Sequence, residues 1–287
     1  MRRTQAPRAP ENVGKSSARF NVLERTPARR AWSLLALGLF CLALGGCSSD
    51  SSSAEAPPAP AHTPDPALLR QADECYAQRA DLAQARAGLA LLRRARAVAP
   101  TDYETTWRIA RLAYVIGDRT TDEKERETVF HEGIEAGETA ARSAPGRVEG
   151  HFWLGANYGG YAQTQGALGG LDAADKVRRE METVRKLDEG LYGGSAYVAL
   201  GQVDLELPGW LGGDRQRALA TLEQGLKYGP QNALLRLQLA KAYLANKRPA
   251  EARQQLNFIL AMNPNPDFKP EYDKCAAEAR ELLKKNF

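Results

Sequence analysis

The sequence is poor in the residue types that most enzyme and metal sites require. It contains three histidines and four cysteines in 287 residues. His62, His131 and His151 have no cysteine or carboxylate at a metal-ligand spacing. Ser195, in "GGSAY", lacks the glycine that a nucleophile elbow places two residues after the serine. The glycine-rich "GALGGLDAADK" lacks the Gly-Lys-Ser/Thr of a phosphate loop. We therefore expect no enzyme, no metal and no cofactor.

A basic surface for nucleic acid is also lacking, although the formal net charge is +4. Residues 1–46 hold eight Lys or Arg and two Glu, so the remaining chain carries 31 basic and 33 acidic residues. The positive charge therefore belongs to the N-terminal segment, and no nucleic-acid partner is expected.

The N-terminal segment has the pattern of a secretory signal. Arg29 and Arg30 precede the 14-residue apolar run Ala31–Leu44, which is too short to span a bilayer as a stable helix. The end of the run, Leu44-Gly45-Gly46-Cys47, resembles the bacterial lipobox, in which the cysteine is acylated and becomes the new N-terminus. We predict a lipoprotein signal peptide at 1–46 and lipidation of Cys47.

A tether follows the predicted anchor. Residues 47–65 contain Ser, Ala and Pro without large apolar side chains, and such a segment cannot form a core. Extended at about 3.1 Å per residue, it spans roughly 50–60 Å. The expected location is the periplasmic side of a bacterial membrane, and Ser48 after the anchor favours the outer membrane over the inner one.

Two cysteines remain in the mature chain beyond the anchor. Cys75 and Cys275 lie in the first and last predicted helices. In an oxidising periplasm they could pair, and the alternative is two small buried hydrophobic residues.

From residue 66 onward the hydrophobic periodicity is helical, and the helices repeat. In the segment 233–264, small and large apolar residues alternate at the spacing of the tetratricopeptide repeat and end on proline. These positions are Leu239, Ala240, Tyr243, Ala252, Leu256, Ile259 and Pro264. Small residues let two antiparallel helices approach closely, and proline ends the unit.

Four further hairpins show the same pattern with insertions. Their markers include Leu92 and Pro100, Trp107 and Pro145, Leu154 and Tyr158, and Tyr197 and Pro230. A final amphipathic segment with Ala276, Ala279 and Leu283 is typical of a capping helix. The sequence resembles the tetratricopeptide family, which implies an all-α solenoid of about five hairpins plus a C-terminal cap over 66–287.

Two consecutive hairpins share an apolar Gly-Gly loop followed by an aspartate. These loops are Leu168-Gly169-Gly170-Leu171-Asp172 and Leu211-Gly212-Gly213-Asp214. We expect Asp172 and Asp214 to cap the helices that follow, and the apolar residues to turn inward over the concave face. The predicted product is a partly roofed apolar pocket; the alternative is that the aromatic residues only fill the core between hairpins. The predicted ligand-binding residues are Phe152, Trp153, Tyr158, Tyr161, Leu168, Tyr197, Val198, Leu205, Trp210 and Leu211.

Within residues 145–262, "HFWLGANYGGYA" and "LGQVDLELPGWLGGD" resemble the periplasmic T component of TRAP transporters, the TatT family. This resemblance implies a lipid-anchored accessory that binds a solute-binding protein and a small apolar ligand, with self-assembly into a homo-oligomer. The alternative is an interaction scaffold for envelope or secretion-machinery assembly. A roofed apolar cavity favours the first function, and an open groove with ladders of charge favours the second.

Overall fold

The computed structural model describes residues 63–287, apart from the side chains of residues 166–171 and 267. The predicted signal peptide, Cys47 and all but the last three residues of the tether lie outside this range. Residues 63–287 form eleven α-helices, two short 3₁₀ helices and no strand. None of these helices combines the length and the apolar character needed to cross a bilayer.

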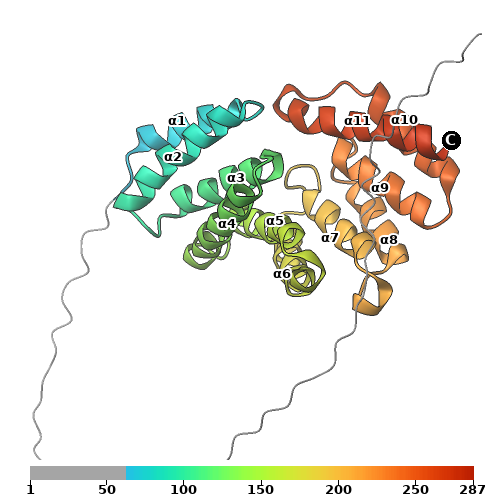
Figure 1. Ribbon diagram of the computed structural model, residues 1–287, viewed down its shortest axis with the longest axis horizontal. Coiled ribbons are helices and arrows are strands. Elements are labelled where there is room, and N and C mark those ends of the chain that lie inside the picture. Colours follow the sequence, from blue (N-terminus) through green and yellow to red (C-terminus); the bar gives the residue numbers. More distant parts are fainter. Residues whose placement is uncertain (1–62) are drawn as a thin grey trace, which may run out of the picture. The chain divides into compact units, whose positions relative to one another are not determined.

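The helices pair into hairpins in the order of the sequence (Figure 1). They are α1 (Pro66–Ala77), α2 (Leu82–Val98), α3 (Tyr103–Arg119), α4 (Glu123–Ser143), α5 (Val148–Thr164), α6 (Gly166–Leu187), α7 (Ser195–Glu206), η1 (Gly209–Leu211), α8 (Arg215–Gly225), α9 (Ala233–Ala245), α10 (Pro249–Ala261), η2 (Pro266–Phe268) and α11 (Lys269–Asn286). The predicted all-α solenoid of five hairpins and a capping helix is confirmed.

Short polar side chains set the starts of six helices. The carboxylates of Asp65, Asp81, Asp102 and Asp122 accept backbone N–H bonds from the first turns of α1 to α4. Asp214 caps α8 as predicted, by accepting from Gln216 N and Arg217 N. Asn232 caps α9. Such caps satisfy donors that the helix itself cannot, and each contributes about 1 kcal/mol.

The prediction that Asp172 caps a helix is wrong. Helix α6 already begins at Gly166, so Asp172 lies inside it and pairs with Lys176 at 2.7 Å. The connection from α5 is Gln165 alone, and the Gly-Gly pair belongs to the first turns of α6 instead of a loop.

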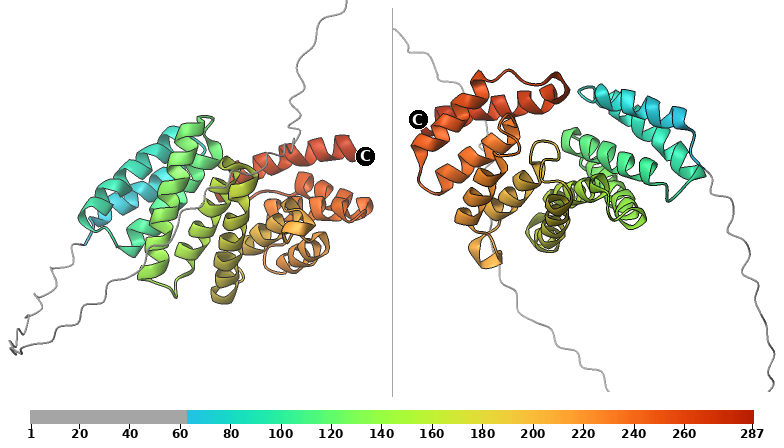
Figure 2. Two further views of the ribbon diagram at one scale, coloured as in Figure 1. Left: turned by 60° about the horizontal axis from the view of Figure 1, so that its bottom comes forward. Right: turned by 180° about the vertical axis from the view of Figure 1, so that it is seen from behind.

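Close packing between hairpins depends on glycines that face large side chains. The Phe130 ring of α4 lies against Gly117 of α3 and Gly160 of α5, where an added Cβ would come within 2.6 and 2.3 Å of ring atoms. Figure 2 shows the successive hairpins from two further directions. The apolar residues form one core around α1–α5, another around α7–α11, and a smaller one between α6 and α7.

The segment between α6 and α7 makes an unusual turn. Tyr192, Gly193 and Gly194 have φ values of 46°, 64° and 72° in succession. Glycine adopts this left-handed region freely, whereas a tyrosine there is strained by about 1–2 kcal/mol. Asn232 Nδ2 holds the turn by donating to the carbonyls of Tyr192 and Gly193 at 3.3 and 2.9 Å.

The two ends of the solenoid meet. Arg79, in the turn after α1, donates to both oxygens of Glu271 in α11 at 3.1 and 2.9 Å. Arg119 also donates to Glu271 at 3.1 Å, and Lys274 donates to Asp118 at 2.7 Å. We call these five residues the ionic seam. Figure 1 shows the start of α11 beside the α1–α2 turn.

Candidate interaction surface

An arginine–aromatic cluster lies where α1, α3, α5 and the Tyr192 turn come together. It comprises Tyr76, Arg79, Trp107, Arg108, Arg111, Phe152, Trp153 and Tyr192. The Tyr76 ring lies between two guanidinium groups, with Arg111 Cζ 3.8 Å and Arg79 Cζ 4.6 Å from its centroid. Burial raises the pKa of Tyr76, so its hydroxyl stays neutral.

Arg111 also lies over the Trp107 ring, together with Arg108. Arg108 Cζ lies 4.3 Å and Arg111 Cζ 4.8 Å from its centroid. Contacts of this kind contribute about 0.5–2 kcal/mol each, more when the cation is desolvated. Arg111 is 8% exposed, and its Nε has no hydrogen-bond partner among the described residues. One buried donor of the cluster is therefore unsatisfied, and burial of such a group costs about 1–3 kcal/mol.

Carboxylates fix the arginines in place. Asp73 accepts from Arg108 Nε at 3.1 Å and from Arg111 Nη2 at 2.5 Å. Glu104 accepts from Arg108 and also from Trp107 Nε1 at 3.0 Å. Desolvation alone would raise the pKa of Glu104, but hydrogen bonds from Arg147, Arg108 and Trp107 outweigh it and lower that pKa to about 2. The carboxylate stays charged near neutral pH and holds the surface rigid.

Three aromatic rings extend the cluster. The Phe152 centroid lies 4.9 Å from Trp153 and 5.1 Å from Tyr192, and Trp153 lies 5.8 Å from Tyr192. Trp153 is buried, while Phe152 and Tyr192 are half-buried. These edge-on contacts offset the strained backbone of Tyr192, since such pairs contribute about 0.5–1.5 kcal/mol each.

Of the predicted ligand-binding residues, Phe152 and Trp153 belong to this cluster, and the others lie outside it. Tyr197 and Val198 are buried in the core around α7–α11, and the Tyr197 hydroxyl donates to Glu189 at 2.8 Å. The Tyr158 hydroxyl donates to Glu138 at 2.7 Å, and the ring centroids of Tyr161 and His131 lie 6.3 Å apart. The Leu168 side chain lies outside the described residues.

The prediction that Trp210 turns inward is wrong, because its side chain is 82% exposed. Leu211 is half-buried, and Leu205 is half-buried beside an open depression. That depression has a volume of about 740 Å³, and Asp204, Glu206, Asp214 and Arg215 line it together with Leu205. It is a polar, open hollow and not the roofed apolar pocket that the sequence led us to expect.

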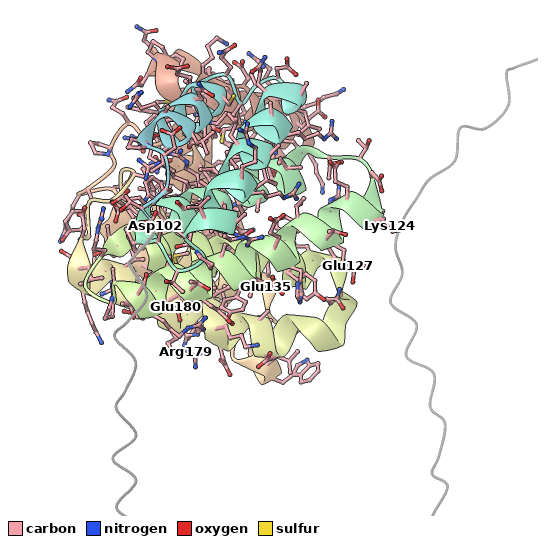
Figure 3. The ribbon with its side chains drawn as sticks, turned by 90° about the vertical axis from the view of Figure 1, so that its left-hand side faces the viewer. Asp102, Lys124, Glu127, Glu135, Arg179 and Glu180 are labelled. Carbon is pink, nitrogen blue, oxygen red and sulfur yellow. The ribbon has the colours of Figure 1, made fainter. Side chains whose placement is uncertain are left out.

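The outer side of the solenoid is charged. Figure 3 labels Lys124, Glu127 and Glu135 along α4 and Arg179 and Glu180 on α6. His151 connects α5 to α6, because its Nδ1 lies 2.8 Å from Glu180 Oε2 and its Nε2 lies 3.1 Å from the Pro145 carbonyl. The hydrogen bond with Glu180 raises the pKa of His151.

Chemistry-bearing residues do not gather elsewhere in the described part. Within it, no three His, Cys, Asp or Glu side chains are placed to hold a metal ion. Cys75 is half-buried and Cys275 buried, and both are free thiols. Burial raises the pKa of the Cys275 thiol to about 12, so this cysteine is a neutral core residue. The interpretation of both cysteines as small hydrophobic residues fits Cys275 better than Cys75.

Several residues of the cluster escaped the sequence analysis. Tyr76, Arg79, Arg108 and Arg111 carried no local signal that singled them out in the sequence. They are brought together by packing between hairpins. Tyr192 did carry a signal, since it directly precedes the glycine pair that forms the left-handed turn.

Comparisons with known proteins agree with the fold. Residues 211–272 match the family described as tetratricopeptide repeat, and residues 68–191 match the family described as regulator of microtubule dynamics protein 1-3. No curated protein matches. A thermophilic TPR protein of Thermus thermophilus, TTC0263, is 24% identical; the alignment covers 73% of this chain and 97% of that one, with a TM-score of 0.54.

A solved structure of MamA is 17% identical, over 71% of this chain and 92% of that one, with a TM-score of 0.42. The matched repeat, the five hairpins and the fold shared with the Thermus protein lead to one assignment. The chain is a helical solenoid of the tetratricopeptide-repeat type.

Proposed function

We propose that this protein is a non-enzymatic scaffold that binds a segment of another envelope protein on the arginine–aromatic cluster. The observation that carries the proposal is the partly exposed Tyr76 ring packed against Arg79 and Arg111. Tyr, Trp and Arg dominate the energetics of protein interfaces, because they offer large contact areas at a small cost in conformational entropy.

The chemistry of the surface limits what can bind. Phe152 and Tyr192 are half-buried and offer ring surface to an apolar side chain. Because Asp73 and Glu104 already neutralise the arginines, a highly charged partner gains little here. A segment that presents an apolar side chain and carries little net charge fits best.

The predicted lipobox supplies the location. Acylation of Cys47 would hold the solenoid at a bacterial membrane, preferably the outer one, at the end of a tether of roughly 50–60 Å. The partner is then expected among proteins of that envelope compartment.

A TRAP-type accessory that carries a small apolar ligand is the second candidate. The contiguous rings of Phe152, Trp153 and Tyr192 support it, since they could cover one side of such a ligand. The outward position of Trp210 counts against it, because the expected roof over the ligand is lost.

Site-specific photocrosslinking in the native host distinguishes the two. A photoreactive phenylalanine derivative replaces Phe152 in the full-length chain, and a control carries it at Glu127 on the outer side of α4. The scaffold proposal expects one defined protein adduct at position 152 that is absent at position 127 and disappears with Tyr76→Ala. Native mass spectrometry of membrane-purified protein that shows a bound organic molecule and no protein adduct would favour the transport accessory.

A further inference from the structure

The turn between α7 and α8 is a rigid structure of hydrogen bonds. Leu211 N donates to the Pro208 carbonyl at 2.9 Å, and Gly213 N donates to the same oxygen at 3.1 Å. Asp214 N reaches the Asp204 carbonyl at 3.0 Å. Gly212 has φ 85°, and a Cβ on Gly213 would lie 1.8 Å from the Leu207 carbonyl oxygen. Only glycine fits these two positions, so the turn has a fixed shape.

Two arginines from neighbouring helices donate hydrogen bonds that hold this turn. Arg178 of α6 and Arg217 of α8 both donate to the Asp204 carboxylate, at 2.5 and 2.6 Å, and that carboxylate is 5% exposed. Both also donate to the Gly212 carbonyl, at 3.1 and 2.7 Å. The Gly212 carbonyl thus accepts hydrogen bonds from α6 and α8, and Asp204 of α7 holds both donors in place.

The result of this construction is an exposed tryptophan. Trp210 is 82% exposed, more than any other large hydrophobic side chain of the described residues. The turn orders its backbone but leaves its largest apolar side chain in water. Trp210 therefore adds no stability to the core. An exposed indole on a fixed support is typical of a contact surface.

The charges around the turn favour a neutral surface as the counterpart. Asp204, Glu206 and Asp214 oppose Arg178, Arg215 and Arg217, and Glu182 pairs with Arg185, so the formal charges cancel. The charges around the turn therefore favour neither an acidic nor a basic partner. Tryptophan is enriched at the interface between bilayer hydrocarbon and water, where its ring is buried and its N–H remains hydrated.

The length of chain before α1 brings a bilayer within reach. Eighteen residues, 48–65, separate the predicted anchor Cys47 from α1, so lipidation would keep the solenoid within roughly 50–60 Å of the membrane. A short Ser/Ala/Pro-rich link of this length corresponds to an effective concentration in the millimolar range. A contact by a single side chain, too weak for a free protein, can then be populated.

We propose that Trp210 inserts into the interfacial layer of the membrane that carries the lipid anchor, and so sets the orientation of the solenoid on that membrane. The proposal rests on lipidation at Cys47 and is independent of which partner the arginine–aromatic cluster binds.

Tryptophan fluorescence tests the proposal. The mature chain contains Trp107, Trp153 and Trp210, and the first two are 7% and 6% exposed. Lipidated full-length protein is purified from membranes and reconstituted in phosphatidylcholine vesicles with or without brominated acyl chains. We expect a blue-shifted emission component that the bromolipid quenches and that Trp210→Phe removes. Phe268→Ala, which deletes another exposed aromatic residue on η2, should leave the quenching unchanged.

The anchor is tested in the same experiment. Cys47→Ser protein, with Trp32→Phe to remove the tryptophan of its uncleaved leader, should lose the quenching several-fold at equal lipid concentration, because the effective concentration is lost. Three results would overturn the proposal: emission that the bromolipid does not quench, quenching that persists in Trp210→Phe, or a mature chain whose mass shows no acyl group. Protection of Trp210 by a protein partner instead of by lipid would assign this surface to that partner.

Discussion

Arg79 and Glu271 lie 192 residues apart in the sequence and are joined by two hydrogen bonds, of 3.1 and 2.9 Å. Arg79 is 4% exposed, and its guanidinium also lies over Tyr76. The contact that closes the solenoid is therefore continuous with the arginine–aromatic cluster. A change in the last helix is transmitted directly to the proposed binding surface.

Removal of the charge at Glu271 should destabilise the protein. Glu271→Gln leaves buried Arg79 without its carboxylate, and hydrogen bonds to charged groups contribute about 1.5–3 kcal/mol. We expect a loss of about 2 kcal/mol in the free energy of unfolding, measured in urea. The matched control is Glu278→Gln, which removes the more exposed pair with Lys241 in the same helix and should change stability by less than about 0.5 kcal/mol. Equal effects of both variants would contradict a special role of the seam.

The glycines beside Phe130 should be intolerant of alanine. A methyl group at Gly117 or Gly160 collides with the ring, and overpacking of this kind destabilises by about 1–3 kcal/mol. Gly159, the neighbour of Gly160, has its nearest contact at 3.8 Å, so Gly159→Ala should stabilise α5 by about 0.5–1 kcal/mol through helix propensity. Thermal unfolding of the three variants checks the difference in sign between adjacent positions.

The link between α5 and α6 should depend on pH. The pKa of His151 is raised above its ordinary value of 6.5, chiefly by the hydrogen bond with Glu180. The stability that protonated His151 contributes is therefore complete below pH 6.5 and is lost as the pH rises through the higher pKa of the folded state. The difference in unfolding free energy between wild type and His151→Gln should be about 1–2 kcal/mol near pH 5.5 and shrink in alkali. The control is His131→Gln, which removes an exposed pair with Glu135 and should change the unfolding free energy by less than about 0.5 kcal/mol.

Asp204 should be essential to the α7–α8 turn. It neutralises both Arg178 and Arg217, and removal of one partner from a buried ion pair typically costs about 3–5 kcal/mol. We expect Asp204→Asn to lose about 3 kcal/mol of stability and to lower the fluorescence anisotropy of Trp210. Glu206→Gln changes a neighbouring exposed carboxylate that binds only Gln202 among the described contacts, and both quantities should stay constant. A rigid Trp210 in Asp204→Asn would show that the backbone hydrogen bonds alone hold the turn.

The repeating elements of the fold were predictable because each hairpin carries its own local signals. Small residues at helix crossings, proline at the ends of units and aspartate before helices are all visible within a few residues. Asp214 caps a helix as this pattern predicts, and Asp172 does not. The two aspartates have the same local pattern, but α6 begins six residues before Asp172, and a glycine pair is compatible with a helix start as well as with a loop.

The candidate surface was less predictable, because its residues come from distant parts of the chain. Trp210 was expected to turn inward on the basis of its hydrophobicity alone. The left-handed backbone of Gly212 and the hydrogen bonds from Arg178 and Arg217 fix the turn that exposes the Trp210 side chain. Neither feature can be recognised in the local sequence. Likewise, the hydrogen bonds between Arg79 and Glu271 cannot be predicted from the sequence, because these residues meet only once the whole solenoid has folded.

The ionic seam also bears on how copies of this protein can associate. Linear helical arrays expose two terminal faces, and through them molecules can stack head to tail into filaments. Here the turn after α1 is already joined to the start of α11 by the pair of Arg79 and Glu271. A head-to-tail stack that used this edge of the solenoid would first have to break that pair, so the ionic seam adds a cost to growth into fibres.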